Sequence, residues 1–242
     1  MTIPLFPKFK PIELSDKKDV EAITHKYPPY SDFNFVSMWS WDIKGEMRIS
    51  ILNDNLVVRF TDYLTGEPFY SFLGDNKVNE TAEALIDLSK EEGLRPILKL
   101  IPEVVVKNLD LKKYQPEEDP DNFDYIYKNH TLSDFSGKKF KNKRHAHDKF
   151  KNSYQDIKLI ITNEIDEKNK KDIAGLDERW AKDKFEKMVD FDIKNEIQAV
   201  KKFFSALSNF SDYRFSFFCL YVGNELVGFS ISSIIDSNYT LC

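Results

Sequence analysis

RFSFFCLYVGNELVGFSISSII, residues 214–235, has the pattern of a β-hairpin. Two apolar runs rich in aromatic and β-branched residues flank Gly223-Asn224, a dipeptide typical of a tight turn between antiparallel strands. Two helical segments precede the hairpin, and the second, from about Asp192, has apolar residues at spacings of three and four. Because QDIKLIIT (155–162) reads as a strand, this half predicts the order strand, helix, helix, antiparallel strands.

The N-terminal half predicts the same order. Its expected strands and helices are a strand at 9–14, helices at 16–27 and 31–42 with Ser31 as N-cap, a hairpin at 46–60, a strand at 68–74, a helix at 78–93, and strands at 95–101 and 122–128. We therefore expect an α/β protein of the α+β kind, with two related mixed sheets and flanking helices. The second unit is expected to be truncated at Cys242.

This repeat predicts three parts: an N-terminal domain at 1–130, a connecting helix at 131–154 and a C-terminal domain at 155–242. The hydrophobic fraction of 41% is typical of a folded globular protein and excludes a disordered one. Two cysteines cannot form a disulfide framework, and Cys219 is expected to be buried and inert. Because no signal peptide or membrane span is visible, a cytoplasmic protein is expected.

The connecting helix is basic, although the whole chain has a formal net charge of −5. Its segment 136–154 contains one acid, Asp148, against these basic residues: Lys138, Lys139, Lys141, Lys143, Arg144, Lys149 and Lys151. One interpretation is a solvated connector that pairs with acids elsewhere, as charge runs usually are. The other is a surface for phosphate groups of RNA or another polyanion. Both interpretations stay open at this point.

The predicted polyanion-binding residues are Lys138, Lys141, Lys143, Arg144 and Lys149. Helical spacing places Lys138, Lys141 and Lys149 outward, and it places Lys143 and Arg144 within or beside the apolar side. A guanidinium can hold a phosphate through two hydrogen bonds, so Arg144 is expected to make the strongest contact.

Other chemistry is poorly represented in the sequence. Asp124, Tyr125 and Trp180 are candidates for a pocket. His145 and His147 lie two residues apart, so on a helix they point in different directions and no metal site is expected. The sequence contains no recognisable motif that pairs a nucleophile with a general base, so the catalytic residues are unknown.

The run DPDNFDYIYKNHTLSDFSGKKFKNKRHAHDKFKNSY (119–154), with SDFNFVSMWSWD (31–42) upstream, resembles the family of the phosphatidylglycerol lysyltransferase C-terminal domain. The matching positions are Asp121, Asn122, Phe123, Asp124, Tyr125, Leu132, Ser136, Gly137, Lys138, Lys143, Arg144 and Phe150. The resemblance implies tandem GNAT-like folds, related to the Fem-type aminoacyltransferases that use aminoacyl-tRNA. Ala146 departs from the family pattern, because it stands where the family has a histidine.

A GNAT domain that uses coenzyme A holds its pyrophosphate in a glycine-rich turn. The corresponding turn of the first half, GDNKVNE (74–80), has one glycine and is acidic, and that of the second half would lie beyond Cys242. We therefore expect no coenzyme A and no other cofactor.

The favoured hypothesis is an acyl- or aminoacyltransferase whose phosphate-bearing donor, such as aminoacyl-tRNA, is held by the basic helix. The alternative is a non-catalytic module that binds RNA or another polyanion on a degenerate GNAT pair. The expected partners are tRNA or another polyanion, and a second copy of the chain through the incomplete C-terminal domain.

Overall fold

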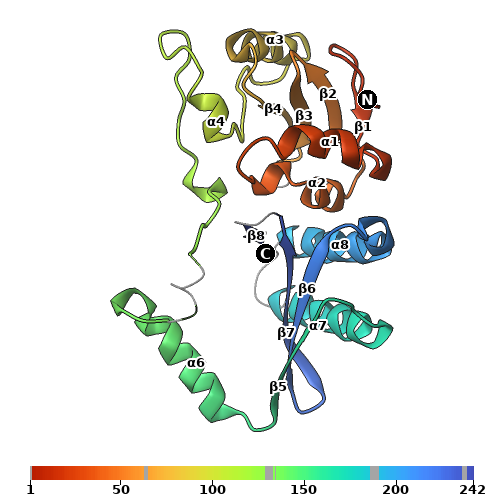
Figure 1. Ribbon diagram of the computed structural model, residues 1–242, viewed down its shortest axis with the longest axis vertical. Coiled ribbons are helices and arrows are strands. Elements are labelled where there is room, and N and C mark those ends of the chain that lie inside the picture. The colour runs from red at the N-terminus through yellow and green to blue at the C-terminus, as the bar shows by residue number, and fades with distance from the viewer. Residues whose placement is uncertain (1, 63–64, 129–132, 134, 186–190, 236–238) are drawn as a thin grey trace. The chain divides into compact units, whose positions relative to one another are not determined.

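The structure is a computed structural model that describes all residues except 1, 63–64, 129–132, 134, 186–190 and 236–238 (Figure 1). The chain forms two compact units. Met1–Asn122 and Val189–Asn209 make up unit 1, and Phe123–Met188 and Phe210–Cys242 make up unit 2. The predicted boundary between residues 130 and 131, and the matched position Leu132, lie outside the described residues.

Unit 1 contains a four-stranded sheet in the order β1-β2-β3-β4, and each strand is antiparallel to the next. The strands are β1 (Lys10–Pro11), β2 (Arg48–Leu52), β3 (Asn55–Thr61) and β4 (Pro68–Leu73). Asn53 and Asp54 turn the chain between β2 and β3 with φ of 52° and 63°. Asn and Asp tolerate this left-handed conformation, which a tight hairpin turn requires.

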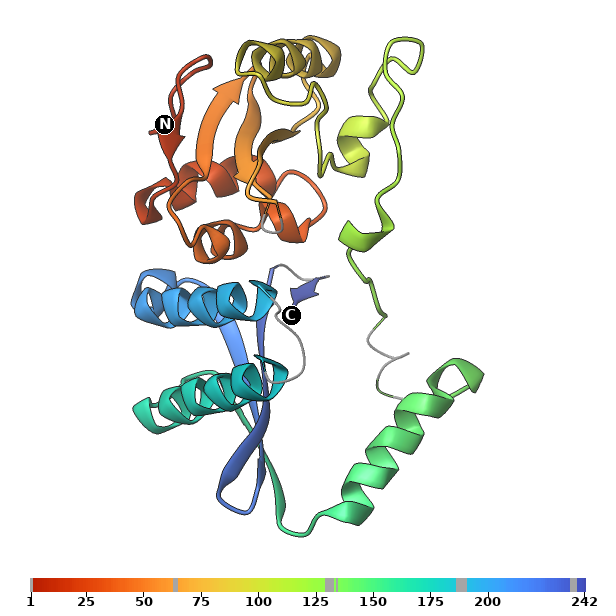
Figure 2. The ribbon, with the colours of Figure 1, turned by 180° about the vertical axis from the view of Figure 1, so that it is seen from behind.

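Helices cover both faces of this sheet (Figure 2). On one face lie α1 (Lys17–Thr24) and α2 (Phe35–Trp41). On the other lie α3 (Val78–Glu91) and α4 (Glu103–Val106), which pack with Val57, Tyr70 and Phe72 of the sheet. The prediction that Ser31 is the N-cap of α2 is wrong. A short 3-10 turn spans Ser31–Phe33, and the side chain of Asn34 caps α2 by accepting a hydrogen bond from the N–H of Ser37 at 3.2 Å.

Unit 2 contains a second antiparallel sheet in the order β5-β6-β7-β8. Its strands are β5 (Ile157–Thr162), β6 (Arg214–Val222), β7 (Glu225–Ile234) and β8 (Thr240–Leu241). Alternate residues of β6 are buried: Phe215, Phe217, Cys219 and Tyr221. Helix α7 (Glu167–Phe185) packs on this sheet, with Ile173 buried. Cys219 is thus buried, as predicted, and burial raises the pKa of its thiol.

Helix α8 (Phe191–Ser205) lies between α7 and β6 in the sequence, but it packs against α2 in unit 1. The ammonium of Lys202 donates a hydrogen bond of 2.6 Å to the carbonyl oxygen of Asp42 and lies 4.5 Å from the centre of the Trp39 ring. Asp42 is the C-cap of α2, so Lys202 provides a cation to a helix C-terminus.

The two halves repeat the order strand, helix, helix and three antiparallel strands, as the sequence predicts. The α+β class is thus confirmed. Two predicted strands are wrong. Residues 95–101 contribute only an isolated bridge, from Leu98 to Tyr70, because Pro96 donates no backbone N–H and Leu100 has φ of 53°, outside the strand region. Residues 123–128 form no strand and are all exposed. None of the described helices has the length and apolar character needed to cross a membrane.

Candidate functional site

The basic segment forms a helix, as predicted. It begins with a 3-10 turn (Lys138–Phe140), continues as α6 (Lys141–Ser153), and contributes no buried residue from α6 itself. Phe140 is buried, and its ring stacks on that of Phe135 with 5.2 Å between the centres. This pair anchors the start of the helix, whereas the remainder of α6 is largely solvated.

We call Lys138, Lys141, Lys143 and Lys149 the basic surface. All four side chains are exposed, and no carboxylate among the described residues lies within ion-pair distance of them. Some lysines elsewhere have an ion-pair partner, such as Lys113 with Glu83 at 2.8 Å and Lys168 with Asp172 at 3.1 Å. Others, such as Lys18 and Lys44, are exposed and have no such partner among the described residues. What distinguishes the four lysines of the basic surface is that they lie together on one short helix. This concentration of unneutralised charge in the described part of the chain favours a surface that binds external anions.

Arg144 is oriented toward the protein backbone. Its Nη1 atom donates hydrogen bonds to the carbonyl oxygens of Phe135 at 2.5 Å and Gly137 at 2.9 Å. Gly137 has φ of +85°, a conformation that glycine adopts without strain. Arg144 therefore fixes the turn from which the basic helix starts, a role that the sequence pattern does not reveal.

The histidines of α6 are both exposed. His147 Nδ1 lies 3.0 Å from Asp148 Oδ1, a contact between neighbours at the surface. Across the described residues, no group of three or more His, Cys, Asp or Glu side chains is arranged to hold a metal ion.

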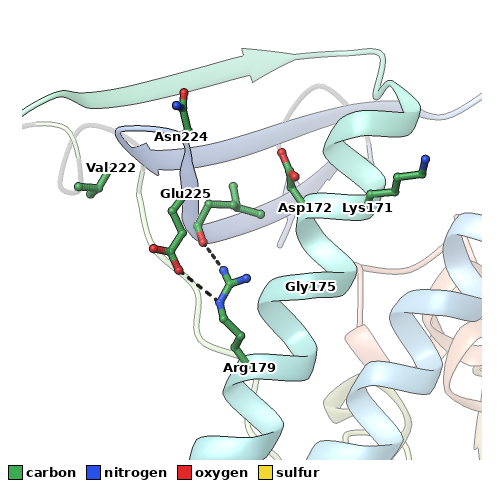
Figure 3. Close-up of a pocket in the computed structure, with 8 residues that line it drawn as sticks. Lys171, Asp172, Gly175, Arg179, Val222, Asn224 and Glu225 are labelled. Carbon is green, nitrogen blue, oxygen red and sulfur yellow. Dashed lines mark hydrogen bonds and ion pairs between the residues drawn. The ribbon is translucent and has the colours of Figure 1, made fainter.

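Unit 2 also has an open groove of about 430 Å³ between α7 and the turn of the β6–β7 hairpin (Figure 3). Its lining residues are Lys171, Asp172, Gly175, Arg179, Val222, Asn224, Glu225 and Leu226. Arg179 crosses from α7 to the hairpin, donating to the carbonyl oxygen of Leu226 at 2.9 Å and pairing with Glu225 at 3.4 Å. Asp172 and Arg179 lie on either side of Gly175 along α7. The groove therefore presents both a carboxylate and a guanidinium.

A hydrogen-bond network lies beside this groove. The Tyr221 hydroxyl donates to Asp172 Oδ2 at 2.8 Å and accepts from Asn169 Nδ2 at 2.9 Å, while Lys168 pairs with Asp172. Burial, together with the bond to Asp172, raises the pKa of Tyr221. The hydrogen bonds from Tyr221 and then Lys168 lower the pKa of Asp172. At neutral pH the carboxylate is therefore charged and the phenol protonated, so neither group is tuned to exchange protons near pH 7.

In unit 1, the turn that precedes α3 is filled by a side chain. Asn55 is buried, accepts from the backbone N–H of Asn76 at 3.2 Å, and donates to the carbonyl oxygen of Asn76 at 2.7 Å. A Cβ added to Gly74 would lie 2.0 Å from Asn55 Oδ1. The backbone N–H of Asn76 therefore already donates its hydrogen bond to a side chain of the protein.

The structure does not gather the predicted pocket residues around this groove. Asp124 and Tyr125 are exposed in the irregular segment before the basic helix, and Trp180 lies on α7. None of the three lines the groove. Sequence reasoning missed Asp172 and Tyr221, because an acid on a helix and a tyrosine in an apolar strand carry no joint signal.

Comparisons with known proteins give one family and one solved structure. The family model described as phosphatidylglycerol lysyltransferase, C-terminal, matches residues 24–241. A crystal structure of a conserved protein of unknown function from Bacteroides thetaiotaomicron is similar, with a TM-score of 0.70 and 22% identity. The match covers 93% of this chain and 74% of that one, and at this identity it shows the fold alone. None of the curated proteins matches. Because the family model spans most of the sequence, the chain belongs to the phosphatidylglycerol lysyltransferase C-terminal domain family.

Proposed function

We propose that this protein is an acyl- or aminoacyltransferase of the tandem GNAT-like kind, related to the Fem-type enzymes, with a phosphate-bearing donor such as aminoacyl-tRNA. Family membership supports a transferase, since the family is described by a lysyltransferase activity. The donor is inferred from the basic surface. We infer a macromolecular donor, because several separated cations match the many phosphates of a polyanion better than they match a single phosphate group.

The observation that carries the proposal is the concentration on one helix of four exposed lysines, none of which has an ion-pair partner among the described residues. A connector helix with a structural charge pattern would pair its lysines with neighbouring acids, as α7 does with Lys168 and Asp172. Like charges close together also repel. Neutralisation of the basic surface by an external polyanion therefore lowers its electrostatic free energy and favours binding.

Aminoacyl-tRNA needs little chemical activation from the enzyme. Its ester is already reactive, and a nucleophilic amine or hydroxyl of the acceptor attacks the carbonyl while the terminal hydroxyl of the tRNA leaves. The protein contributes mainly by holding donor and acceptor in a reactive geometry. No cofactor is required for this step.

A salt titration of tRNA affinity tests the donor. Replacing Lys138, Lys141 and Lys149 by Glu should weaken binding, and the log–log salt dependence should flatten by about 0.7 for each phosphate of a single strand that the variant no longer neutralises. The matched control reverses three exposed lysines of unit 1, Lys18→Glu, Lys26→Glu and Lys44→Glu, with the same change in net charge. Circular dichroism confirms that both variants fold.

Equal reductions of affinity in the two variants would show that only net charge matters, and unchanged binding in both would remove the polyanion role. Transfer is measured separately, with radiolabelled lysyl-tRNA as donor and phosphatidylglycerol vesicles or a soluble amine as acceptor. Label in either product supports the transferase. Specific tRNA binding without any transfer would favour the alternative, a non-catalytic polyanion-binding module.

A further inference from the structure

A short aromatic segment in unit 2 is exposed to an unusual degree. Phe123, Tyr125 and Tyr127 are 52%, 82% and 57% exposed, and they occupy alternate positions. We call residues 123–127 the aromatic segment. In an extended chain, alternate side chains point to the same side, so the three rings would form one continuous apolar face. Rings of this size are normally buried in folded proteins.

Strand β5 has a matching surface. It is the outermost strand of its sheet, and within the described residues it pairs only with β6. Leu159 and Ile161 also occupy alternate positions and are 55% and 59% exposed. They lie opposite Leu220 and Phe218 of β6, so an apolar face continues across both strands. An edge strand with such a face readily accepts another strand.

We propose that the aromatic segment adds to the open edge of β5 as a fifth strand of this sheet. Its three rings would extend the apolar face of Leu159 and Ile161. Asp124 would then lie on the other face, the face of Lys158, where an opposite-charge pair across strands is favourable. The proposal does not depend on transferase activity.

Chain geometry fits this pairing. Helix α6 has 13 residues and is about 20 Å long at 1.5 Å per residue. Strand β5 has 6 residues and is also about 20 Å long at 3.3 Å per residue. A helix of equal length returns the chain to the end of the sheet where β5 begins, as in a parallel crossover. The added strand should therefore run parallel to β5.

The same chain is a better occupant of this edge than a second copy. The aromatic segment is covalently connected to β5 through residues 129–156, so its local concentration near the edge does not fall on dilution. Pairing would attach both ends of the basic helix to neighbouring strands of one sheet. It would thereby hold the basic surface in a fixed orientation.

Amide hydrogen exchange of the full chain, read by mass spectrometry, tests this pairing. Amides of residues 123–127 should exchange about 100-fold or more slowly than in an unstructured peptide. The double variant Leu159→Ser/Ile161→Ser should abolish this protection. Lys158→Ser, which changes the other face of the same strand, should retain it. Exchange at the unstructured rate in the wild-type protein would overturn the proposal.

Two further measurements exclude other causes. If the β5 double variant fails to fold, Phe123→Ser/Tyr125→Ser/Tyr127→Ser alters only exposed side chains and should accelerate exchange at the β5 amides. Unchanged β5 exchange in that folded variant would contradict the pairing. Protection that disappears on dilution of the wild-type protein would identify a second copy as the occupant, and would overturn the intramolecular strand.

Discussion

Tyr221 of β6 and Asp172 of α7, 49 residues apart in the sequence, are joined by a hydrogen bond of 2.8 Å from phenol to carboxylate. The carboxylate of Asp172 also accepts from Lys168, and the phenol of Tyr221 also accepts from Asn169. The network therefore joins one residue of β6 to three residues of α7. The arrangement fastens the first turns of α7 to the sheet and fixes one side of the groove.

Replacing Tyr221 by Phe should destabilise unit 2. The substitution removes the donor to Asp172 and leaves the buried amide of Asn169 without its acceptor, which should lower the free energy of unfolding by about 1–2 kcal/mol. Urea denaturation measures this change. Tyr154→Phe deletes the same atom from a half-exposed ring and should change stability by less than about 0.5 kcal/mol. Equal effects would show that the network contributes nothing specific.

Stability should also fall in acid through Asp172. Its pKa in the folded state is below the ordinary value of 3.8, because Tyr221 and Lys168 donate to the carboxylate. A group with a lowered folded-state pKa stabilises the protein fully above its unfolded pKa and loses that contribution as the pH falls through the folded value. Below about pH 4, the wild-type protein should therefore lose more stability than Asp172→Asn. Parallel pH profiles for the two proteins would contradict this assignment.

Arg144 and Lys143 should differ in what they control. Arg144→Ala removes two hydrogen bonds to backbone carbonyls, so the turn before α6 should exchange its amides faster and be weakened by about 1 kcal/mol. Lys143→Ala removes only an exposed charge and should reduce the salt dependence of tRNA binding while leaving that exchange unchanged. If Arg144→Ala weakens binding with no change in exchange, the guanidinium acts on phosphate, as the sequence predicts.

Gly74→Ala should be among the most damaging small substitutions in unit 1. The new Cβ would meet the buried Asn55 side chain at 2.0 Å, and overpacking of this kind costs about 2–3 kcal/mol. Gly45→Ala is the matched control, because its Cβ would meet nothing within 4 Å and only its positive φ adds strain, about 1 kcal/mol. The effect should be less than additive in Asn55→Gly/Gly74→Ala, since the clash is then absent. If the losses of stability were fully additive, the destabilisation by Gly74→Ala would not come from the clash with Asn55.

Local patterns in the sequence predicted much of the fold, because its hairpins and amphipathic helices carry local signals. Gly223-Asn224 and Asn53-Asp54 specify turns through backbone conformation alone, and both hairpins are present. The strand predicted at 122–128 failed for a different reason. Its aromatic alternation is a valid strand pattern, but strand assignment also requires a hydrogen-bonded neighbour, which the sequence does not specify.

The candidate site was only partly predictable. A run of lysines is visible in any sequence, so the basic surface was found from composition. Arg144 was expected to contact phosphate, but its turn-forming role depends on the positive φ of Gly137 and the folding back of two carbonyls. Asp172 and Tyr221 meet only after a strand and a helix have packed, so no local pattern could identify them.

The assignment of α8 to unit 1 has a consequence for dissecting the protein into fragments. The chain leaves unit 1 after Asn122, returns for Val189–Asn209, and leaves again, so neither unit is one continuous stretch of sequence. A fragment that ends before α8 would expose the surface of α2 where Lys202 lies beside Trp39. A fragment that begins at β5 would carry α8 without that surface. Co-expression of the complementary pieces, rather than either one alone, is therefore the arrangement in which each half can recover its native fold.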